Sequence, residues 1–523
     1  MRKHVSELTG QVNGHLLFDF QKAAYAQLEL ELDGRVQDLV EIVISEYAED
    51  GRVVHTPGWR TFKINDIRLS PDQKLYRFHI PEHRGAYGAF PHIETPPEFG
   101  GEIAVFRYVE INHYYGPAKV RRIEFYNDAP EDAAHFKSSD NKLNQIWEFC
   151  KYSLLATSIF PCYVDGERER MPYEGDTYIT QLGHFCCGAD YSIAEHTIDH
   201  FMANGKHTWP TEWLLLTPLL ARDFYLYSGN QQALARWLPQ LPDKTLPHMQ
   251  REDGLLVPKG KIRDIIDWPE EDRDNYEFGE TNFVPNAYRY EALKTLSELS
   301  KNSNYNTEYK KLLNIIRKTM LKAGLFVDNP DSTHTSLHTA LFALRFGLLK
   351  PAEIPAHQAI LRERGMACSV YAAQFLLESC FMSGLDELGM ELLTNDGPRS
   401  WFNMMREGST ISMEAWGEYD KPHQDWSHPW GAAPANIIPR FVVGVRPTAP
   451  GFARFVVKPS PAAPKRFAFR QPTPWGAIEI CKDLTDVKVS LIGTDRQLHQ
   501  AAPGEFTVSP DSQPSPSEAI LAR

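Results

Sequence analysis

Alternating apolar and polar positions dominate the first quarter of the chain. Leu28, Leu30 and Leu32 are separated by glutamates, and the same alternation recurs around residues 40–44, 76–80, 105–111 and 123–125. Turn residues separate these runs. A period of two places successive side chains on opposite faces of a strand. We therefore predict an N-terminal antiparallel β-sandwich over residues 1–135.

The period changes near residue 138, where Ser138-Ser139-Asp140 can cap a helix. Apolar positions then follow helical spacing, first at Leu143, Ile146, Trp147, Cys150 and Leu154, and later over residues 193–201, 213–227, 288–299, 309–321, 337–349 and 370–381. A region of about 300 residues, at roughly 25 for each helix and its loop, holds about twelve helices. Twelve helices in hairpins can close into an (α/α)6 barrel, which we predict over residues 136–440. An open helical solenoid is the alternative, and it fits the long irregular loops less well.

Alternation returns after residue 440, at Phe455 and Val457, Ile478 and Ile480, and again over residues 487–491. We predict a small C-terminal β-sandwich over residues 441–508. Residues 509–523 are rich in serine and proline, which is typical of a flexible tail. The predicted fold class is multidomain α plus β, with a central (α/α)6 six-hairpin barrel flanked by two antiparallel β-sandwiches.

Composition narrows the class of protein. Among 523 residues, 42% are hydrophobic and 24% are charged, as in a soluble globular protein. The net charge of -13 argues against nucleic acid and anionic membranes as partners. No run of apolar residues is long enough for a membrane span. The seven cysteines form no CxxC motif and no apolar leader follows Met1, so we expect reduced thiols and a cytoplasmic location.

Several enzyme classes lack their motifs. The chain has no GxSxG elbow, no GxxxxGK loop and no GxGxxG fingerprint. His196 and His200 have the spacing of zinc ligands on a helix, but the glutamate of HExxH and a third ligand are missing. A structural histidine pair fits better, so we predict no metal site and no cofactor.

An acidic loop is the strongest chemical signal in the chain. Residues 165–176 contain Asp165, Glu167, Glu169, Glu174 and Asp176, together with Arg168 and Arg170. The loop lies between two apolar segments, and buried acids are costly unless they pair or take part in chemistry. A glycosidase loop and a salt-bridged structural loop are the two readings that these residues leave open.

Other acids stand beside aromatic residues far along the chain. Glu414 lies between Met413 and Trp416, Asp267 precedes Trp268, and Glu212 precedes Trp213. Hydrolysis of a glycoside needs one carboxylic acid to protonate the leaving oxygen and a second carboxylate to activate water or attack. The apolar neighbours of Glu414 predict desolvation and a raised pKa for that carboxyl.

The order of these clusters resembles the six-hairpin α-L-rhamnosidases of glycoside hydrolase family 78. Residues 169–176 are similar to the family's Asp/Glu-Arg-x-x-Trp-x-Gly-Asp, and residues 410–414 to its Thr-Thr-x-Trp-Glu. Residues 427–431 resemble its Asn-His-x-x-x-Gly segment. Outside the barrel, residues 107–110 resemble an Arg-Tyr-Val-Glu strand, and residues 443–452 resemble the entry to the last sandwich.

The resemblance implies an inverting mechanism with Glu169 as general acid and Glu414 as general base. The residues that it places around the sugar are Asp165, Arg168, Tyr173, Asp176, Glu212, Asp267, Trp268 and His428. Asp176 has a helix cap as its alternative. Trp401 is a further candidate for the leaving-group side, with a core position as its alternative. Tyr173, Met413 and Glu212 depart from the family's Trp, Trp and Asp.

The predicted function is that of an inverting, exo-acting α-L-rhamnosidase that releases terminal rhamnose from a glycoside or oligosaccharide. One alternative keeps the barrel and hydrolyses another deoxy sugar or an unsaturated uronide. Another is a non-catalytic glycan-binding protein. The expected partner is a carbohydrate, and exposed sandwich faces make a homodimer a further prediction.

Overall fold

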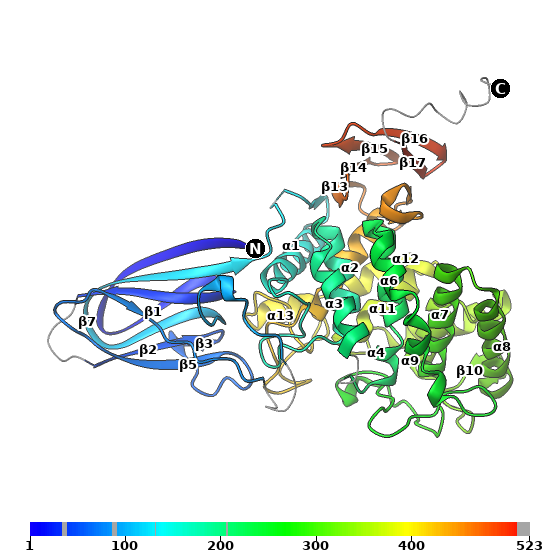
Figure 1. The fold of residues 1–523 in the computed structure, drawn as a ribbon, viewed down its shortest axis with the longest axis horizontal. Coiled ribbons are helices and arrows are strands. Elements are labelled where there is room, and N and C mark those ends of the chain that lie inside the picture. The colour runs from blue at the N-terminus through cyan, green and yellow to red at the C-terminus, as the bar shows by residue number, and fades with distance from the viewer. Residues whose placement is uncertain (34–38, 86–91, 131, 205–207, 510–523) are drawn as a thin grey trace.

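The computed structural model of the chain describes residues 1–33, 39–85, 92–130, 132–204 and 208–509. A β-sheet domain occupies one end, the helices fill the rest of the long axis to the other end, and a small β domain lies over one side of the helices (Figure 1). The flexible tail predicted over residues 509–523 lies outside the described residues, apart from Ser509, which ends strand β17 (Glu505–Ser509).

Two long strands, β1 (Arg2–Leu32) and β7 (Ala104–Tyr126), form the centre of the N-terminal domain. Residues 118–124 of β7 pair with residues 4–10 of β1 on one side and with residues 26–32 on the other. The sheet therefore curls into two layers, which matches the predicted sandwich. The other strands are β2 (Leu39–Ser45), β5 (Phe62–Arg68) and β6 (Leu75–Arg77), in the order β5-β2-β7-β1-β6, and a small ribbon of β3 (Ala48–Glu49) and β4 (Arg52–Val53).

Six helices form the inner ring of the central domain, because each contacts the next and the last contacts the first. The ring consists of α2 (Glu174–Cys187), α5 (Thr217–Ser228), α7 (Phe283–Ser300), α9 (Leu337–Arg345), α11 (Val370–Met382) and α14 (Pro434–Ile437). The outer layer consists of α1 (Asn141–Thr157), α3 (Ser192–Asn204), α6 (Gln231–Trp237), α8 (Ser303–Met320), α10 (Ile354–Arg364) and α12 (Asp386–Thr394). The predicted (α/α)6 barrel is confirmed.

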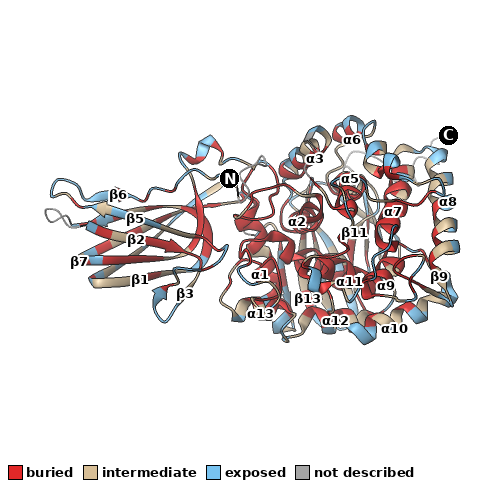
Figure 2. Ribbon diagram, turned by 90° about the horizontal axis from the view of Figure 1, so that it is seen from below, coloured by how far each residue is buried: buried red, intermediate tan, exposed pale blue. Residues whose placement is uncertain are grey.

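Burial separates the two layers of the barrel. Every residue of α2 is buried, whereas α8 buries only Leu312, Ile316 and Met320, which follow one another at one-turn spacing. Figure 2 shows α2 and α11 buried along most of their length and the outer helices exposed on one face. A helix with a single apolar stripe belongs outside, whereas α2 is enclosed on all sides and buries polar residues such as Glu174, Asp176 and His184 along with its apolar ones.

One predicted helix is broken into two. The pattern over residues 213–227 predicts a continuous helix, but the short α4 (Thr211–Leu214) ends before α5 begins at Thr217. Pro218 stands in the first turn of α5, where its missing N–H leaves no hydrogen bond unmade. The predicted helix over residues 337–349 likewise ends earlier, at Arg345 of α9.

The C-terminal domain contains two four-stranded antiparallel sheets. One consists of β11 (Val445–Pro447), β12 (Arg454–Val457), β17 and β16 (Gln497–Ala502), and the other of β15 (Asp486–Ile492), β14 (Gly476–Asp483), β13 (Arg466–Thr473) and β8 (His135–Ser138). Strand β8 precedes the barrel in the sequence but pairs with β13. The boundary predicted at residue 135 therefore falls at the first residue of a strand that belongs to the C-terminal sheets.

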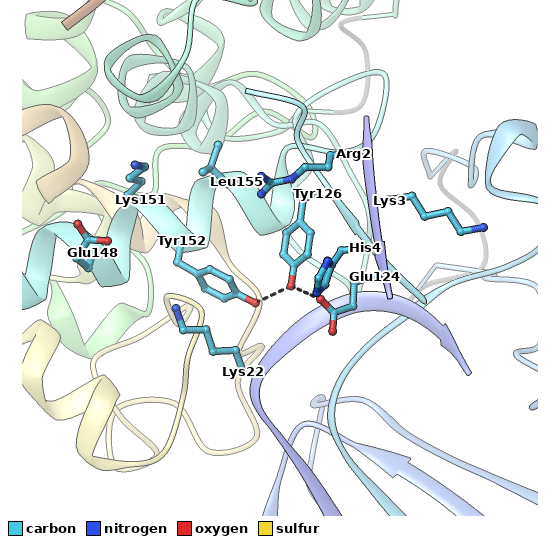
Figure 3. A pocket seen from close by; sticks show the side chains of 10 residues that line it. All are labelled: Arg2, Lys3, His4, Lys22, Glu124, Tyr126, Glu148, Lys151, Tyr152 and Leu155. Carbon is cyan, nitrogen blue, oxygen red and sulfur yellow. Dashed lines mark hydrogen bonds between the residues drawn. The ribbon is translucent and has the colours of Figure 1, made fainter. Parts of the chain in front are cut away.

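Helix α1 joins the barrel to both β domains. Trp147 packs edge-on against Phe469 of the C-terminal sheet, with ring centres 5.7 Å apart. On the other side, Tyr152 donates to the Ala23 carbonyl at 2.6 Å, and its hydroxyl meets that of Tyr126 at 3.3 Å. Figure 3 shows this joint, which borders a cleft of about 510 Å³ and continues from Tyr126 to the Glu124 carboxylate. The N-terminal sandwich is thus hydrogen-bonded to the barrel.

All seven cysteines are free thiols, and only Cys481 is exposed. Within the described ranges, no helix combines the length and apolar character needed to cross a lipid bilayer.

Gly444 allows a tight connection after the last helical turn of the barrel. Its φ is 83°, and a Cβ there would lie 1.8 Å from the Lys458 carbonyl oxygen. We predict that Gly444→Ala lowers the free energy of unfolding by about 3 kcal/mol or more, because left-handed strain and a backbone clash add together. Urea unfolding followed by tryptophan fluorescence measures this change. Gly493→Ala is the control, since Gly493 has a similar φ of 68° but open space at the Cβ position, and should cost about 1–2 kcal/mol.

Candidate active site

A cavity of about 410 Å³ opens among loops that connect the barrel helices. This volume lies in the range of about 300–1,000 Å³ that is usual for small-molecule sites. Its walls include Asp165, Arg168, Glu169, Tyr173, Asp176, Trp268, Glu414 and His428, all predicted from the sequence, together with Trp59, Trp209, Trp213, Ile265, Lys421 and Trp430. The structure therefore brings most of the predicted site residues together.

The acidic loop between α1 and α2 doubles back on itself. Asp165 and Met171 exchange two hydrogen bonds, one to the Asp165 carboxylate at 2.8 Å and one to the Met171 carbonyl at 2.9 Å. Arg170 takes a left-handed φ of 51° within this turn. Gly166 packs so closely on Asp425 that a Cβ would lie 2.3 Å from its carboxylate. The loop is therefore held against the segment that carries the second carboxylate.

The two arginines of this loop have different tasks. Arg170 is fully buried and forms a two-point ion pair with Glu167 at 2.9 and 3.1 Å. It also contacts Glu102 at 2.9 Å and the Ile103 carbonyl at 3.0 Å, both in the N-terminal sandwich. The structural salt bridge that the sequence left open is therefore real for Glu167 and Arg170, while Asp165, Arg168 and Glu169 line the cavity.

Arg168 lies between the two candidate catalytic carboxylates. Its Nη2 donates to Glu169 Oε1 at 2.9 Å and to Glu414 Oε1 at 3.1 Å. Its Nη1 donates to Glu414 Oε2 at 3.0 Å. Glu169 Oε1 and Glu414 Oε1 both accept from Nη2. The distance between these two oxygens is therefore no greater than the two hydrogen-bond lengths together. Residues from distant parts of the chain thus meet on one guanidinium.

Glu414 is an ionised carboxylate in this arrangement. Burial would raise its pKa, but the charges of Arg168, His428 and Lys421 outweigh burial and lower the pKa to about 2. The Nζ of Lys421 hydrogen-bonds Oε1, and the backbone N–H of Asp425 donates to Oε2 at 3.2 Å. The raised pKa predicted from the apolar sequence neighbours is therefore wrong, because charged groups distant in sequence surround the carboxylate.

Tyr173 supports Glu169 from the other side of the loop. Its hydroxyl donates to Glu169 Oε2 at 2.9 Å, and its ring packs on Trp213 with centres 5.6 Å apart. A tryptophan, as in the family motif, has no hydroxyl to make this bond. The Tyr173 departure thus changes the hydrogen bonding of the predicted general acid.

His428 and Asp176 form a buried pair on the cavity wall. The Nε2 of His428 lies 2.9 Å from Asp176 Oδ1, and its ring lies against Trp430 with centres 4.5 Å apart. Asp176 stands in the first turn of α2, where the residue before the helix makes no side-chain cap. Its contact with His428 and its cavity position distinguish it from a simple helix cap.

Three predicted substrate-binding residues lie outside the cavity wall. Glu212 accepts from the backbone N–H groups of Ile265 and Ile266, at 3.3 and 3.0 Å. Asp267 is fully buried and bonds to His338 at 2.7 Å and to the Ser369 N–H at 2.9 Å.

Trp401 is in the core, donating to the Gly431 carbonyl at 2.7 Å and packing edge-on against Trp416. The structure thus corrects the leaving-group position predicted for Trp401 to its core alternative. Glu212 and Asp267 instead shape the turn that presents Ile265 and Trp268.

Trp59 and Lys421 line the cavity without any sequence signal. Trp59 comes from the N-terminal sandwich and Lys421 from the loop after Glu414, and neither belongs to an acid-rich cluster. The acid-and-aromatic clusters of the sequence contain Trp209, Trp213 and Trp430, so their place in the site could have been predicted. In the described part of the chain, no group of three or more His, Cys, Asp or Glu residues is arranged to hold a metal ion.

The family model for the bacterial alpha-L-rhamnosidase 6 hairpin glycosidase domain matches residues 131–442, more than half of the chain. The chain belongs to this family. The family membership expected from the sequence motifs is therefore confirmed.

The relatives of this rhamnosidase-family chain are distant and longer. An α-L-rhamnosidase of Alteromonas sp. (strain LOR) is 24% identical over 415 residues, which cover 71% of this chain and 44% of the relative. One of Formosa agariphila is 21% identical over 506 residues, covering 88% and 52%. The crystal structure of Streptomyces avermitilis α-L-rhamnosidase complexed with L-rhamnose matches with a TM-score of 0.74 at 14% identity, covering 97% of this chain and 52% of the other. The chain spans about half the length of the curated relatives, and the structural likeness establishes the fold.

Glu212 makes the stability of this rhamnosidase-family chain depend on pH. Burial and the neighbouring Asp264 raise its pKa to about 8, above the ordinary value of about 4.3. The folded protein therefore keeps a proton that the unfolded chain releases, so stability falls as pH rises from about 5 to about 8. We predict that the melting midpoint of Glu212→Gln falls less over this range than that of the wild type, measured by tryptophan fluorescence.

Glu252→Gln, at an exposed position, is the control for this comparison and should follow the wild-type pH dependence. The slope with pH is compared rather than the absolute midpoint, because the substitution also alters two backbone hydrogen bonds. Parallel slopes for wild type and Glu212→Gln would contradict the assignment of a buried, protonated Glu212.

Proposed function

We propose that the chain is an inverting, exo-acting α-L-rhamnosidase that releases terminal rhamnose from a glycoside or oligosaccharide. The observation that carries this proposal is the pair of carboxylates, Glu169 and Glu414, held on Arg168 inside a cavity of a rhamnosidase-family barrel. Hydrolysis of a glycoside needs two such groups.

Glu414 is the general base of this mechanism. Its pKa of about 2 keeps it ionised at neutral pH, so it can accept a proton from the water that attacks the anomeric carbon. Glu169, within hydrogen-bond reach of Tyr173 and Arg168, protonates the leaving oxygen. Arg168 bonds to both groups and so fixes their relative position.

The remaining cavity walls fit a deoxy sugar. Asp165, Asp176 and His428 present polar atoms for the sugar hydroxyls, whereas Tyr173, Trp213 and Trp268 supply apolar surface. The C6 methyl group of rhamnose suits an aromatic wall, because its burial releases water from apolar surface on both partners.

Inversion is the stereochemical outcome that the family resemblance favours. Carboxyl groups of inverting hydrolases stand about 6.5–9.5 Å apart to admit a water, and those of retaining enzymes about 5–5.5 Å apart. In the structure, Glu169 Oε1 and Glu414 Oε1 accept from the same Arg168 nitrogen at 2.9 and 3.1 Å, so they lie closer together than this inverting separation. In the proposed mechanism, the two carboxyls therefore move apart as substrate enters between them, and the water is activated on the Glu414 side. Inversion of an α-L-rhamnoside gives β-L-rhamnose as the first product.

The cellular compartment and the oligomeric state are also part of this proposal. Seven free cysteines suit a reducing compartment such as the bacterial cytoplasm. Assembly as a homodimer stays a prediction.

We predict that Glu169→Gln and Glu414→Gln each lower kcat by about 10²–10⁴-fold while folding is kept, because each removes one proton transfer. Hydrolysis of an aryl α-L-rhamnoside measures the rates, and proton NMR identifies the first anomer released. Glu167→Gln is the comparison for charge loss within the same loop, since Glu167 pairs with Arg170 and does not line the cavity. Near wild-type turnover by Glu414→Gln would overturn the assignment.

A panel of aryl glycosides tests which sugar the protein hydrolyses. Turnover of another deoxy sugar or an unsaturated uronide, with none of the rhamnoside, would replace the substrate in this proposal and keep the barrel chemistry. Sugar binding in calorimetry without any turnover would indicate a non-catalytic glycan-binding protein.

Lys421 is expected to set the acid side of the pH profile. Its charge helps to lower the pKa of Glu414, so Lys421→Met raises that pKa. Because the base works only when ionised, the acid limb of kcat/KM should move to higher pH by about one unit or more. Lys421→Arg keeps the charge and should leave the limb close to the wild-type position. An unmoved limb in Lys421→Met would show that Lys421 does not control the base.

A further inference from the structure

Trp59 reaches the cavity from the N-terminal sandwich. It lies on the loop between β4 and β5, and it lines the cavity together with Arg168, Glu169 and Glu414. Its ring centre is 5.8 Å from the Arg168 guanidinium carbon. The Trp59 side chain is also 51% exposed, which is unusual for an indole in this protein. An exposed tryptophan beside buried catalytic groups marks the outer end of the cavity.

The backbone around Trp59 is packed against the barrel. The Trp59 N–H donates to the His423 carbonyl at 3.2 Å. Gly58 has a φ of 73°, and a Cβ there would lie 2.3 Å from the His423 Cβ. Only glycine fits such a close approach in this conformation. The loop and the segment that follows Lys421 are therefore in direct contact.

Arg60 anchors the loop from the other side of Trp59. It is 7% exposed and donates to the Pro57 carbonyl at 2.6 Å and to Glu418 Oε1 at 2.8 Å. Its guanidinium also stacks over Tyr47 at 4.3 Å and over Trp426 at 4.7 Å. Gly58 and Arg60, the two sequence neighbours of Trp59, are therefore both held in place, while the Trp59 side chain itself is exposed.

Burial along the cavity indicates which part of a substrate Trp59 would meet. Asp165, Asp176 and His428 are buried, as is Glu414, whereas Trp59 is half-exposed. In an exo-acting hydrolase, the terminal sugar occupies the closed end of the cavity and the leaving group extends toward solvent. Trp59 therefore stands on the leaving-group side of the scissile bond.

We infer that Trp59 is a platform for the leaving group and selects ring-shaped ones, either a second sugar or an aryl group. A flat indole offers a large apolar face at low conformational cost, and sugar C–H faces and aryl rings both stack on such a face. This inference rests on the proposed hydrolase function and extends it to the part of the substrate that the barrel residues leave uncovered.

The test compares two leaving groups in Trp59→Ala and Trp59→Leu. With a rhamnosyl disaccharide, kcat/KM should fall about tenfold, mainly through KM, because stacking is lost while the chemistry is intact. With methyl α-L-rhamnoside, whose leaving group is too small to stack, it should stay within about twofold. Trp59→Phe keeps a flat ring and should retain most of the disaccharide activity. Tyr115→Ala, another exposed aromatic outside the cavity, is the matched control.

Each outcome separates the platform from the hydrolase proposal. Equal losses on both substrates would overturn the platform and indicate that Trp59 instead positions Arg168. If the wild type is active and the Trp59 variants keep its kcat/KM on both substrates, the platform is wrong and the hydrolase proposal stands. A wild type inactive on both rhamnosides would overturn both proposals. If Trp59→Ala fails to fold, the ratio of the two substrates in Trp59→Leu and Trp59→Phe decides.

Discussion

One buried guanidinium organises the candidate site. Arg168 donates to Glu169 and to both oxygens of Glu414, so three ionisable groups share a small volume. The guanidinium charge favours the ionised form of Glu414 and helps to lower its pKa. Arg168 is held in turn, because its backbone N–H donates to the Asp425 carboxylate at 3.1 Å. The acidic loop and the segment around Glu414 are thus positioned by the same set of charges.

The N-terminal sandwich is part of this arrangement. Arg170 ties the acidic loop to Glu102, and Arg60 ties the sandwich to Glu418 beyond the second carboxylate. Together with the tyrosine joint to α1, these contacts hold the sandwich on the barrel at several points. A residue of the sandwich can therefore take a defined position at the mouth of the cavity, as Trp59 does.

Much of the architecture follows from periodicity. The change from a period of two to helical spacing and back predicts sandwich, barrel and sandwich, because each period corresponds to one way of burying apolar side chains. Pairing between distant segments is not encoded in local spacing. The curled sheet of β1 and β7 and the addition of β8 to the C-terminal sheets both depend on such pairing. Pro218 is a local signal for the break before α5. The prediction of one continuous helix followed the apolar pattern instead of this signal.

For the site, the sequence by itself determined the family and the acids that meet in the cavity, because short motifs keep their order along the chain. Only the tertiary structure decided where each side chain of a motif goes. Asp267 and Trp268 are neighbours, yet the first is buried beneath the cavity and the second lines it. The tertiary structure alone also determined that the pKa of Glu414 is lowered and that Trp59 and Lys421 line the cavity. The physical reason is that electrostatic interaction depends on distance and burial in space, and neither can be read from separation along the chain.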